Sequence, residues 1–265
     1  MIPPRARDYG PRMPFLETPE ANGKKLYLFG ELHPENLYTN LMEQIVKSAQ
    51  AQIGSYSPER RRATMGELRE DLQLLDEQNA QRFQMALGEE DAVEAYTQAF
   101  DDALTQLITI VHPHLETYRR TRFEECRIIA KETTSTTWMH ERTLLERLKP
   151  ECVYWEGNGV LDRPLPMYAQ RYGIRNIFLD QDEALHDRLF NVNTNTEYDA
   201  LQRKREQNWI EYISYGGNTE LLIAGLQHVQ GTWGLLDLLG KKGVPTQRVD
   251  TDISESIVKR AMQLL

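Results

Sequence analysis

The sequence predicts an α/β fold, in which a mainly parallel central sheet is flanked by helices and carries a long all-helical insertion after the first strand-helix unit. Three observations predict it. Short apolar runs that end in a glycine or an acid occur near both ends of the chain. After residue 150 such runs alternate with helical patterns, which is typical of parallel sheets. Between them, residues 57–149 show helical periodicity almost throughout.

The first regular elements are expected from Lys24 onward. Residues 1–23 are rich in proline and show little periodicity, so they are expected to form an irregular arm. KLYLFG then reads as a strand, and Pro34 suits the first turn of a helix, where its missing N–H costs nothing. That helix is expected to run from about Glu35 to Gln52 and to end near Gly54.

The helical insertion is expected to contain three breaks, because apolar residues recur at intervals of three and four on either side of them. The breaks are Gly88, the pair His112-Pro113 and the polar stretch 133–137. No linker separates this block from its surroundings. We therefore expect residues 24–265 to form a single α/β domain in which 57–149 is an insertion.

After Pro150 the elements alternate. Strands are expected at ECVYWEG (151–157), NIFLD (176–180), ELLIAGL (220–226) and QRVD (247–250). Helices are expected around 164–173, after Gln181, near 196–215 and at about 232–240.

Composition narrows the class of protein. The net charge of −9 and the pI near 5.3 disfavour binding to nucleic acid or to anionic lipid, both of which reward a basic surface. No window reaches the roughly 18 apolar residues of a membrane span, and the first residues lack the apolar core of a signal peptide. Two cysteines without metal-type spacing fit a reducing compartment. We expect a soluble, cytoplasmic protein.

The pattern Gly-x-x-His occurs twice, and each copy ends an apolar strand and precedes a helix. The copies are GELH, which holds Glu31 and His33, and GLQH, which ends at His228. In an open α/β sheet ligands bind outside the carboxyl ends of the strands, so residues at this position face a substrate. Two further strands carry acids at the same edge, Glu156 and Asp180. The sequence thus predicts a site along one rim of the sheet.

Four stretches together resemble the erythromycin esterase-like, ChaN-like and TraB/Tiki hydrolase superfamily. They are GELH (30–33), YWEG (154–157), REQNWIEYI (205–213) and AGLQHVQGTWGLLDLLGKKG (224–243). The resemblance covers about half of the chain and leaves out the helical block. It implies an active site at the sheet rim and carries over to Glu31, His33, Glu156, Arg205 and His228.

The expected chemistry is hydrolysis of an ester, amide or peptide bond in a small-molecule or peptide substrate. In one route, His33, Glu156 and His228 hold a divalent metal, Mn or Zn, whose bound water attacks. In the other, His33 is a general base on free water, oriented by Glu31 or Glu156, and His228 with Arg205 stabilises the oxyanion. The acid two residues before His33 favours the metal-free route. Asp180 and Trp209 are expected to bind substrate.

Two other functions fit the same residues. A ChaN-like module would bind haem or another ligand through rim histidines. Alternatively, the chain would be a peptide-tailoring enzyme or partner protein of a biosynthetic pathway, whose helical block grips a peptide or another protein and whose rim carries out a non-hydrolytic step. The hydrolase hypothesis predicts that His33 and His228 lie within reach of one small ligand and that the helical block lies over or beside the rim.

Overall fold

The computed structural model describes residues 15–18, 24–157, 163–192, 194–213, 218–229, 234–244, 246–249, 255–261 and 263–264. They belong to two compact units. The sheet unit comprises Met1–Leu32 and His140–Glu255, and the helical unit comprises His33–Met139 and Ser256–Leu265. The helical unit begins at His33, directly after the first long strand, so it includes the first helix, which the sequence predicts to lie before the insertion 57–149. The assignment of 24–265 to a single domain stays a prediction.

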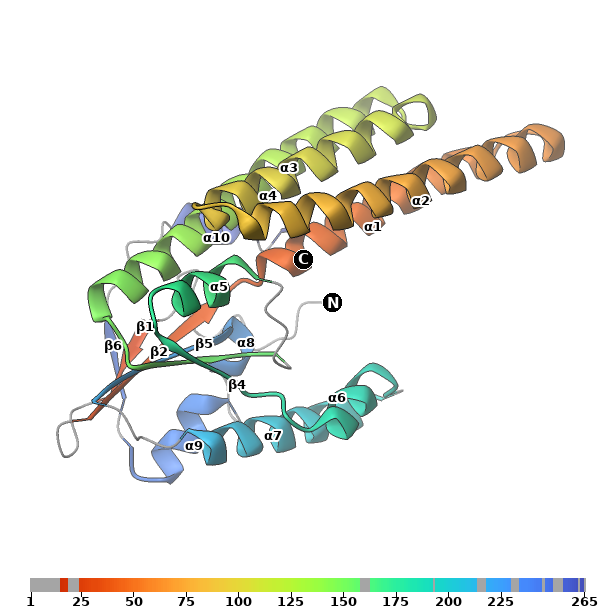
Figure 1. The fold of residues 1–265 in the computed structure, drawn as a ribbon. Coiled ribbons are helices and arrows are strands. Elements are labelled where there is room, and N and C mark those ends of the chain that lie inside the picture. The colour runs from red at the N-terminus through yellow and green to blue at the C-terminus, as the bar shows by residue number, and fades with distance from the viewer. Residues whose placement is uncertain are drawn as a thin grey trace. The chain divides into compact units, whose positions relative to one another are not determined.

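The sheet unit is built on a six-stranded, mainly parallel sheet, which confirms the predicted fold class (Figure 1). The strand order is β4-β3-β5-β2-β1-β6. Neighbours among β4, β3, β5 and β2 are parallel, whereas β1 runs antiparallel to β2 and to β6. The strands are β1 (Phe15–Glu17), β2 (Lys25–Glu31), β3 (Cys152–Trp155), β4 (Arg175–Phe178), β5 (Thr219–Gly225) and β6 (Gln247–Val249).

Strand β1 corrects the expectation that residues 1–23 are irregular throughout. Phe15 is buried and stacks on Tyr27 of β2, with ring centroids 5.6 Å apart. Just after the strand, the Thr18 hydroxyl accepts a hydrogen bond of 2.8 Å from the Leu26 N–H. The strand is three residues long, so it carries too little alternation to be recognised without its partner.

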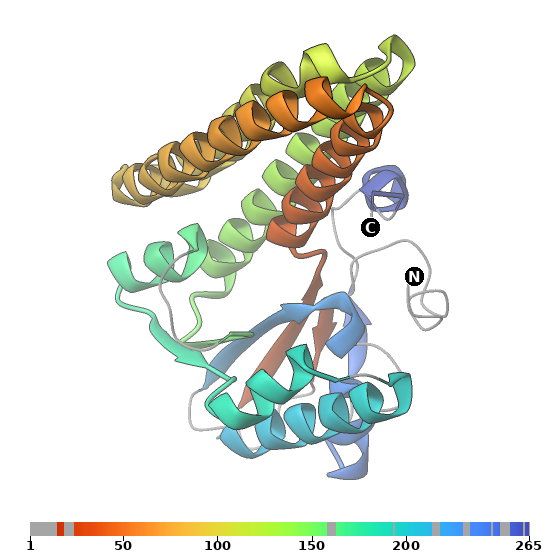
Figure 2. The same ribbon diagram turned by 90° about the vertical axis from the view of Figure 1, so that its right-hand side faces the viewer.

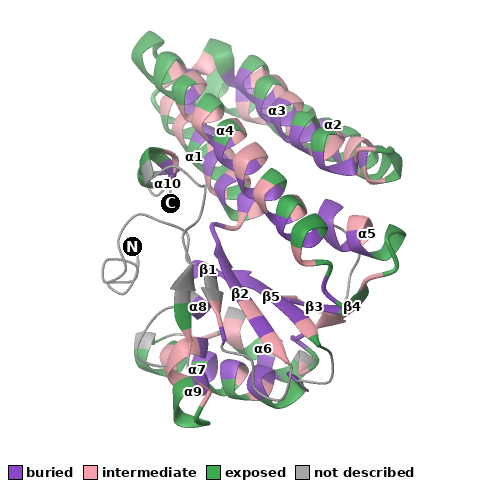
Figure 3. Cartoon of the chain, turned by 90° about the vertical axis from the view of Figure 1, so that its left-hand side faces the viewer, coloured by how far each residue is buried: buried purple, intermediate pink, exposed green. Residues whose placement is uncertain are grey.

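Helices cover both faces of the sheet within this unit. Helix α5 lies on one face and α6, α7 and α9 lie on the other (Figures 1 and 3). Strand β5 is buried at six of its seven positions, as expected for a central parallel strand covered on both sides. The helices wholly within the unit are α5 (Pro164–Arg171), α6 (Glu183–Phe190), α7 (Asn195–Tyr212), α8 (Leu226–Val229) and α9 (Leu235–Lys241).

The core under α7 and α9 fixes the position of α7, which carries part of the site described below. Leu26, Leu28 and Leu222 of the central strands pack with Trp209 and Ile210 of α7. All five side chains are at least 97 % buried. Because full burial of one such side chain stabilises a fold by about 1.5–3 kcal/mol, this contact fixes the rotation of α7 about its axis.

The helical unit contains long helices (Figure 2). Aromatic side chains pack together in its core. Tyr96 and Phe100 of α3 contact Trp138 of α4 with centroids 5.5 and 5.6 Å away, and Tyr38 and Phe83 extend the cluster. The predicted breaks at Gly88 and His112-Pro113 are confirmed. The elements are α1 (Pro34–Gly54), α2 (Pro58–Gly88), α3 (Ala92–Val111), η2 (His112–His114), α4 (Thr117–Leu148) and α10 (Glu255–Ala261). The part of α4 from His140 onward and the first residue of α10, Glu255, belong to the sheet unit.

The predicted break at residues 133–137 is wrong, because α4 continues without interruption through them. Thr133, Thr134 and Thr137 are all buried, and the Thr133 hydroxyl donates to the Ile129 carbonyl one turn earlier at 2.8 Å. Packing therefore overrides the weak helix propensity of threonine. Among the described residues, no helix combines the length and the apolar character that crossing a membrane requires.

Candidate functional site

The carboxyl ends of the parallel strands bring together most of the residues that the sequence singled out. Glu31 is the last residue of β2 and pairs in register with Gly225, the last residue of β5. Glu156 directly follows β3, and Asp180 lies two residues beyond β4. His228 lies in α8, which begins immediately after β5. The rim predicted from the two Gly-x-x-His motifs therefore exists in the sheet unit.

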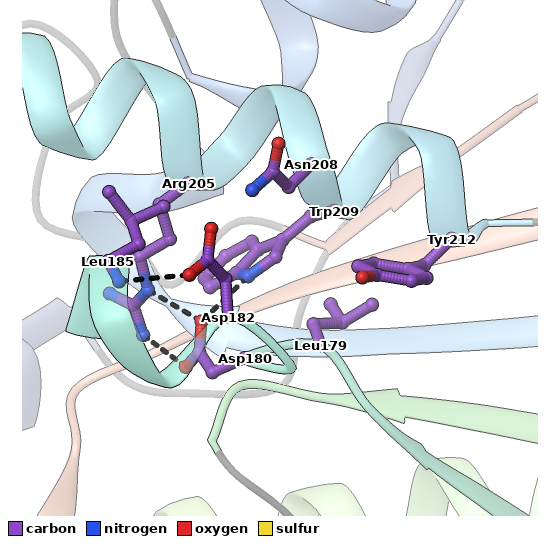
Figure 4. Close-up of a pocket in the computed structure, with 8 residues that line it drawn as sticks. All are labelled: Leu179, Asp180, Asp182, Leu185, Arg205, Asn208, Trp209 and Tyr212. Atoms are coloured by element: carbon purple, nitrogen blue, oxygen red, sulfur yellow. Dashed lines mark hydrogen bonds and ion pairs between the residues drawn. The ribbon is translucent and has the colours of Figure 1, made fainter.

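Arg205 of α7 is the centre of the cluster, and Asp180 holds it with two hydrogen bonds. Nε of Arg205 donates to Oδ1 of Asp180 at 2.7 Å, and Nη2 donates to Oδ2 at 2.5 Å (Figure 4). The Asp180 carboxylate also accepts from Trp209 Nε1 at 2.8 Å and from the Gly157 N–H at 3.0 Å. Since this carboxylate accepts four hydrogen bonds, the guanidinium has one orientation.

Trp209 completes this arrangement from the next turn of α7. The Arg205 guanidinium carbon lies 4.6 Å from the centre of the indole ring, within the range of a cation–π contact. Trp209 is fully buried and Asp180 is 94 % buried. Both residues position Arg205, and direct contact with substrate stays a prediction for each.

Glu156 is the second carboxylate on Arg205. Its Oε1 accepts from Nη2 of Arg205 at 2.9 Å, and its Oε2 accepts from the Gly225 N–H at 2.8 Å. Oε1 also lies 3.2 Å from Nε2 of His228. The backbone of β5 thus fixes one oxygen, while the other is shared between a guanidinium and an imidazole.

His228 is held from both sides of its ring. Nδ1 lies 2.7 Å from Oε1 of Glu206, and Nε2 faces Glu156 and also Nη1 of Arg205, which is 3.3 Å away. The ring lies against Trp209 with centroids 5.1 Å apart. Glu206 was not identified from the sequence, although it precedes Trp209 by three residues in the REQNW stretch.

Burial and charge set the protonation of these groups. Burial raises the pKa of Glu206 to about 7, and its hydrogen bond to His228 only partly opposes this. Burial by itself would lower the pKa of His228, but the charge of Glu156 and the hydrogen bonds to Glu156 and Glu206 raise it. The pKa of Arg205 is also raised, because Glu156 and Asp180 outweigh its burial. Arg205 is therefore a permanent cation, and the titrations of Glu206 and His228 are coupled through their 2.7 Å contact.

Exposure decides which of these groups a ligand can reach. The side chains of Glu156 and Arg205 are 10 % and 11 % exposed, whereas His228 is 2 % exposed. On the α6 side, Asp180, Arg205 and Trp209 border a pocket of about 10 Å³, which is room for about one water (Figure 4). A wider depression of about 550 Å³ shares Asp182 and Tyr212 with that pocket.

The two residues of the first motif belong to different units. Glu31 ends β2 in the sheet unit, is 96 % buried, and lies 3.7 Å from Nη1 of Arg163. His33 is the N-cap residue of α1 in the helical unit. The proximity of His33 to His228 and the location of the helical block at the rim both stay predictions.

The chain matches no protein-family model, no curated protein and no solved structure. The resemblance to the erythromycin esterase-like, ChaN-like and TraB/Tiki hydrolases accordingly stays a prediction. The candidate site rests on the convergence of β3, β4, α7 and α8.

A metal ion does not fit the donor atoms of the sheet unit as they stand. Both nitrogens of His228 and both oxygens of Glu156 already have protein partners. Among the described residues, no group of three or more His, Cys, Asp or Glu side chains is arranged to hold a metal. The predicted set that includes His33 spans the two units and remains a hypothesis.

Proposed function

We propose that this protein is a hydrolase of ester, amide or peptide bonds and that its catalytic centre is the Glu156–Arg205–His228 cluster at the rim of the sheet. The observation that carries the proposal is a permanent cation, Arg205, paired with a carboxylate, Glu156, whose side chain is 10 % exposed, at the place where open α/β sheets bind ligands. The erythromycin esterase-like, ChaN-like and TraB/Tiki resemblance, read from the sequence, supports the same reaction class.

Arg205 is suited to stabilise the oxyanion that forms when water attacks a carbonyl group. Its charge does not titrate, and Asp180 and Trp209 fix its orientation before substrate arrives. Donors that are oriented in advance inside a buried site contribute much of the rate enhancement in acyl transfer. Glu156, at hydrogen-bond distance from Arg205, is then the acid–base group nearest to the developing charge.

The water that attacks needs a base, and the proposal retains His33 in that role, with Glu31 as the residue that orients it. This part rests on the GELH motif and not on a distance. The substrate is proposed to be a small molecule or a peptide. A cytoplasmic location belongs to the same proposal, and the two free thiols, Cys126 and Cys152, support it.

Hydrolysis by the purified full chain tests the proposal. A panel of alkyl esters, nitrophenyl esters and reporter peptides is incubated with the native protein and with Glu156→Gln. Because the amide cannot take or give the proton, turnover should fall on the order of 10²-fold or more for at least one bond class. Asp91→Asn is the matched control, since Asp91 lies outside the site, caps α3 by accepting from the Glu94 N–H, and asparagine caps equally well.

Two outcomes would sink the proposal. The first is that no member of the panel is hydrolysed faster than in buffer. The second is that Glu156→Gln hydrolyses every substrate as fast as Asp91→Asn does, while circular dichroism shows both variants folded.

The haem-binding alternative gains no support at His228. An axial ligand must present a free ring nitrogen, and both nitrogens of this buried ring are engaged. A Soret band that appears with haemin in the native chain and disappears in His33→Ala would nevertheless favour that alternative.

A further inference from the structure

His228 has an unusual set of partners at Nε2. A carboxylate oxygen of Glu156, which can only accept, lies 3.2 Å away, and Nη1 of Arg205, which can only donate, lies 3.3 Å away. If Nε2 carries a proton, it donates to Glu156. If Nε2 is bare, it accepts from Arg205. Both neutral tautomers of the ring therefore find a partner without any movement of the side chain.

The other nitrogen, Nδ1, meets a partner that can also change its role. Oε1 of Glu206 lies 2.7 Å away, and a carboxyl group donates when protonated and accepts when ionised. Each tautomer of His228 thus corresponds to one protonation state of Glu206. A histidine that serves only to brace a fold needs one tautomer, and this environment accommodates two.

The surroundings of Glu206 favour its protonated form. It is completely buried in α7, and its Oε2 has no hydrogen-bond partner among the described residues. Leaving an ionised carboxylate oxygen buried and unpaired is costly, so the neutral acid is favoured until a nearby charge compensates. The charged and titratable groups that face the Glu206–His228 pair are Glu156 from the end of β3 and Arg205 from α7.

We propose that Glu206, His228 and Glu156 form a proton relay that converts Glu156 from a carboxylate into a carboxylic acid, with Glu206 as the buried proton store. In one state Glu206 is protonated, Nε2 of His228 carries the imidazole proton and Glu156 is ionised. The proton on Nε2 then moves to Glu156 as the proton of Glu206 moves to Nδ1. Two protons are bound before and after, and Arg205 hydrogen-bonds the bared Nε2.

The relay deepens the proposed hydrolase function, on which its use rests, by assigning a class of substrate. A carboxylic acid at Glu156 donates its proton to the departing oxygen or nitrogen as the bond to the acyl carbon breaks. Amines and alkoxides need that proton in order to leave, whereas nitrophenolate leaves as an anion. The relay therefore predicts that hydrolysis of amides and alkyl esters depends on Glu206 and that hydrolysis of activated esters does not.

The first test needs no substrate, so it can fail separately from the hydrolase proposal. The chain is labelled with ¹⁵N-histidine, and the His228 signals among the six histidines are assigned as those lost in His228→Gln. Because a protonated and a bare ring nitrogen have very different ¹⁵N shifts, the spectra report the tautomer directly. In the native protein the two neutral tautomers should interconvert between pH 6 and 8. Each ring nitrogen of His228 should therefore carry the proton in part of the molecules.

Glu206→Gln should remove this behaviour, because an amide cannot exchange a proton with Nδ1. The ring should then stay in one neutral tautomer at pH 8. Glu220→Gln is the matched control, since Glu220 is an equally buried acid at the opposite end of β5 and bonds to the Tyr154 hydroxyl. That variant should leave the His228 signals unchanged.

The second test uses two esters of the same acyl group. Glu206→Gln should slow hydrolysis of the alkyl ester on the order of 10²-fold and that of the nitrophenyl ester by no more than a few-fold. Equal losses on both esters would mean that Glu206 is only a structural residue. If Glu206→Gln does not fold, the native spectra decide: a single fixed tautomer of His228 from pH 5 to 9 overturns the relay.

Discussion

Replacing Asp180 by asparagine is expected to loosen α7 from the sheet while leaving the volume of the side chain unchanged. Asp180 accepts from Nε and Nη2 of Arg205, from Trp209 Nε1 and from the Gly157 N–H, at 2.5–3.0 Å. An amide keeps one oxygen and turns the other position into a donor, which then faces other donors. The variant therefore loses at least one bond to Arg205 and leaves a buried cation with less compensation.

The size of the effect follows from the burial of the pair. Removing one partner of a buried ion pair costs about 3–5 kcal/mol. Glu156 remains as a second partner for Arg205, so we expect a loss near the lower end, about 3 kcal/mol, in the free energy of opening around α7. At 1.4 kcal/mol per factor of ten, that corresponds to roughly a 10²-fold larger population of the open form.

Hydrogen exchange measured by mass spectrometry can detect the larger open population around α7 within the sheet unit. Peptides from α7 and from the end of β4 should exchange roughly 10²-fold faster in Asp180→Asn than in the native chain. Peptides from α3 in the helical unit serve as the internal reference. Asp182→Asn is the control. Asp182 caps α6 by accepting a hydrogen bond from the Leu185 N–H, and asparagine caps equally well, so the expected change is below about 0.5 kcal/mol. If both variants exchange alike, Asp180 does not hold α7.

Three further predictions concern pH, metal and the helical unit. The pKa of the Glu206 carboxyl group is about 7 in the folded chain and 4.5 in the unfolded chain, so the folded chain keeps a proton that the unfolded chain has already released. The free energy of unfolding should therefore fall by up to about 3 kcal/mol as the pH rises from 4.5 through 7. The raised pKa of His228 acts in the same direction, and urea midpoints at pH 5 and 8 should show a smaller difference in Glu206→Gln. His33→Ala should lower turnover by roughly 10²- to 10⁴-fold, while dialysis against EDTA leaves native activity intact; stoichiometric metal that is lost together with activity would contradict the metal-free route. Leu107→Ala, at a fully buried position of α3, should destabilise the helical unit by about 2–5 kcal/mol in urea, without changing the His228 spectra.

The parallel strands of the sheet could be predicted because each is an apolar run long enough to be recognised alone. Strand β5, for example, is buried at six of seven positions and reads as ELLIAG. The short edge strand β1 depends on pairing with β2 and β6, which no local pattern encodes. The sequence predicts a break in α4 because helix propensity reflects the residue type, threonine, and not the burial that stabilises these threonines within the helix.

The site was predicted in part for a similar reason. Rim position identified Glu156, Asp180 and His228, since the end of a strand is visible in sequence. Glu206 was missed because it lies on a helix. Its signal is the spacing i, i+3, i+4, i+7 of Gln202, Arg205, Glu206 and Trp209, all facing inward. Periodicity searches weigh apolar residues, so a buried stripe made mostly of polar residues is counted as solvent-facing.

Gly157 turns the chain at the rim with φ +130°, a conformation that side chains with a Cβ rarely adopt. Its N–H is also one of the four donors to Asp180, and Glu156 is the preceding residue. One backbone position thereby links the orientations of two carboxylates. In a saturation library, Gly157 should tolerate fewer replacements than the open space at its Cβ position suggests. Distant homologues that preserve the site should keep a Glu-Gly pair after this strand even where the surrounding residues have diverged.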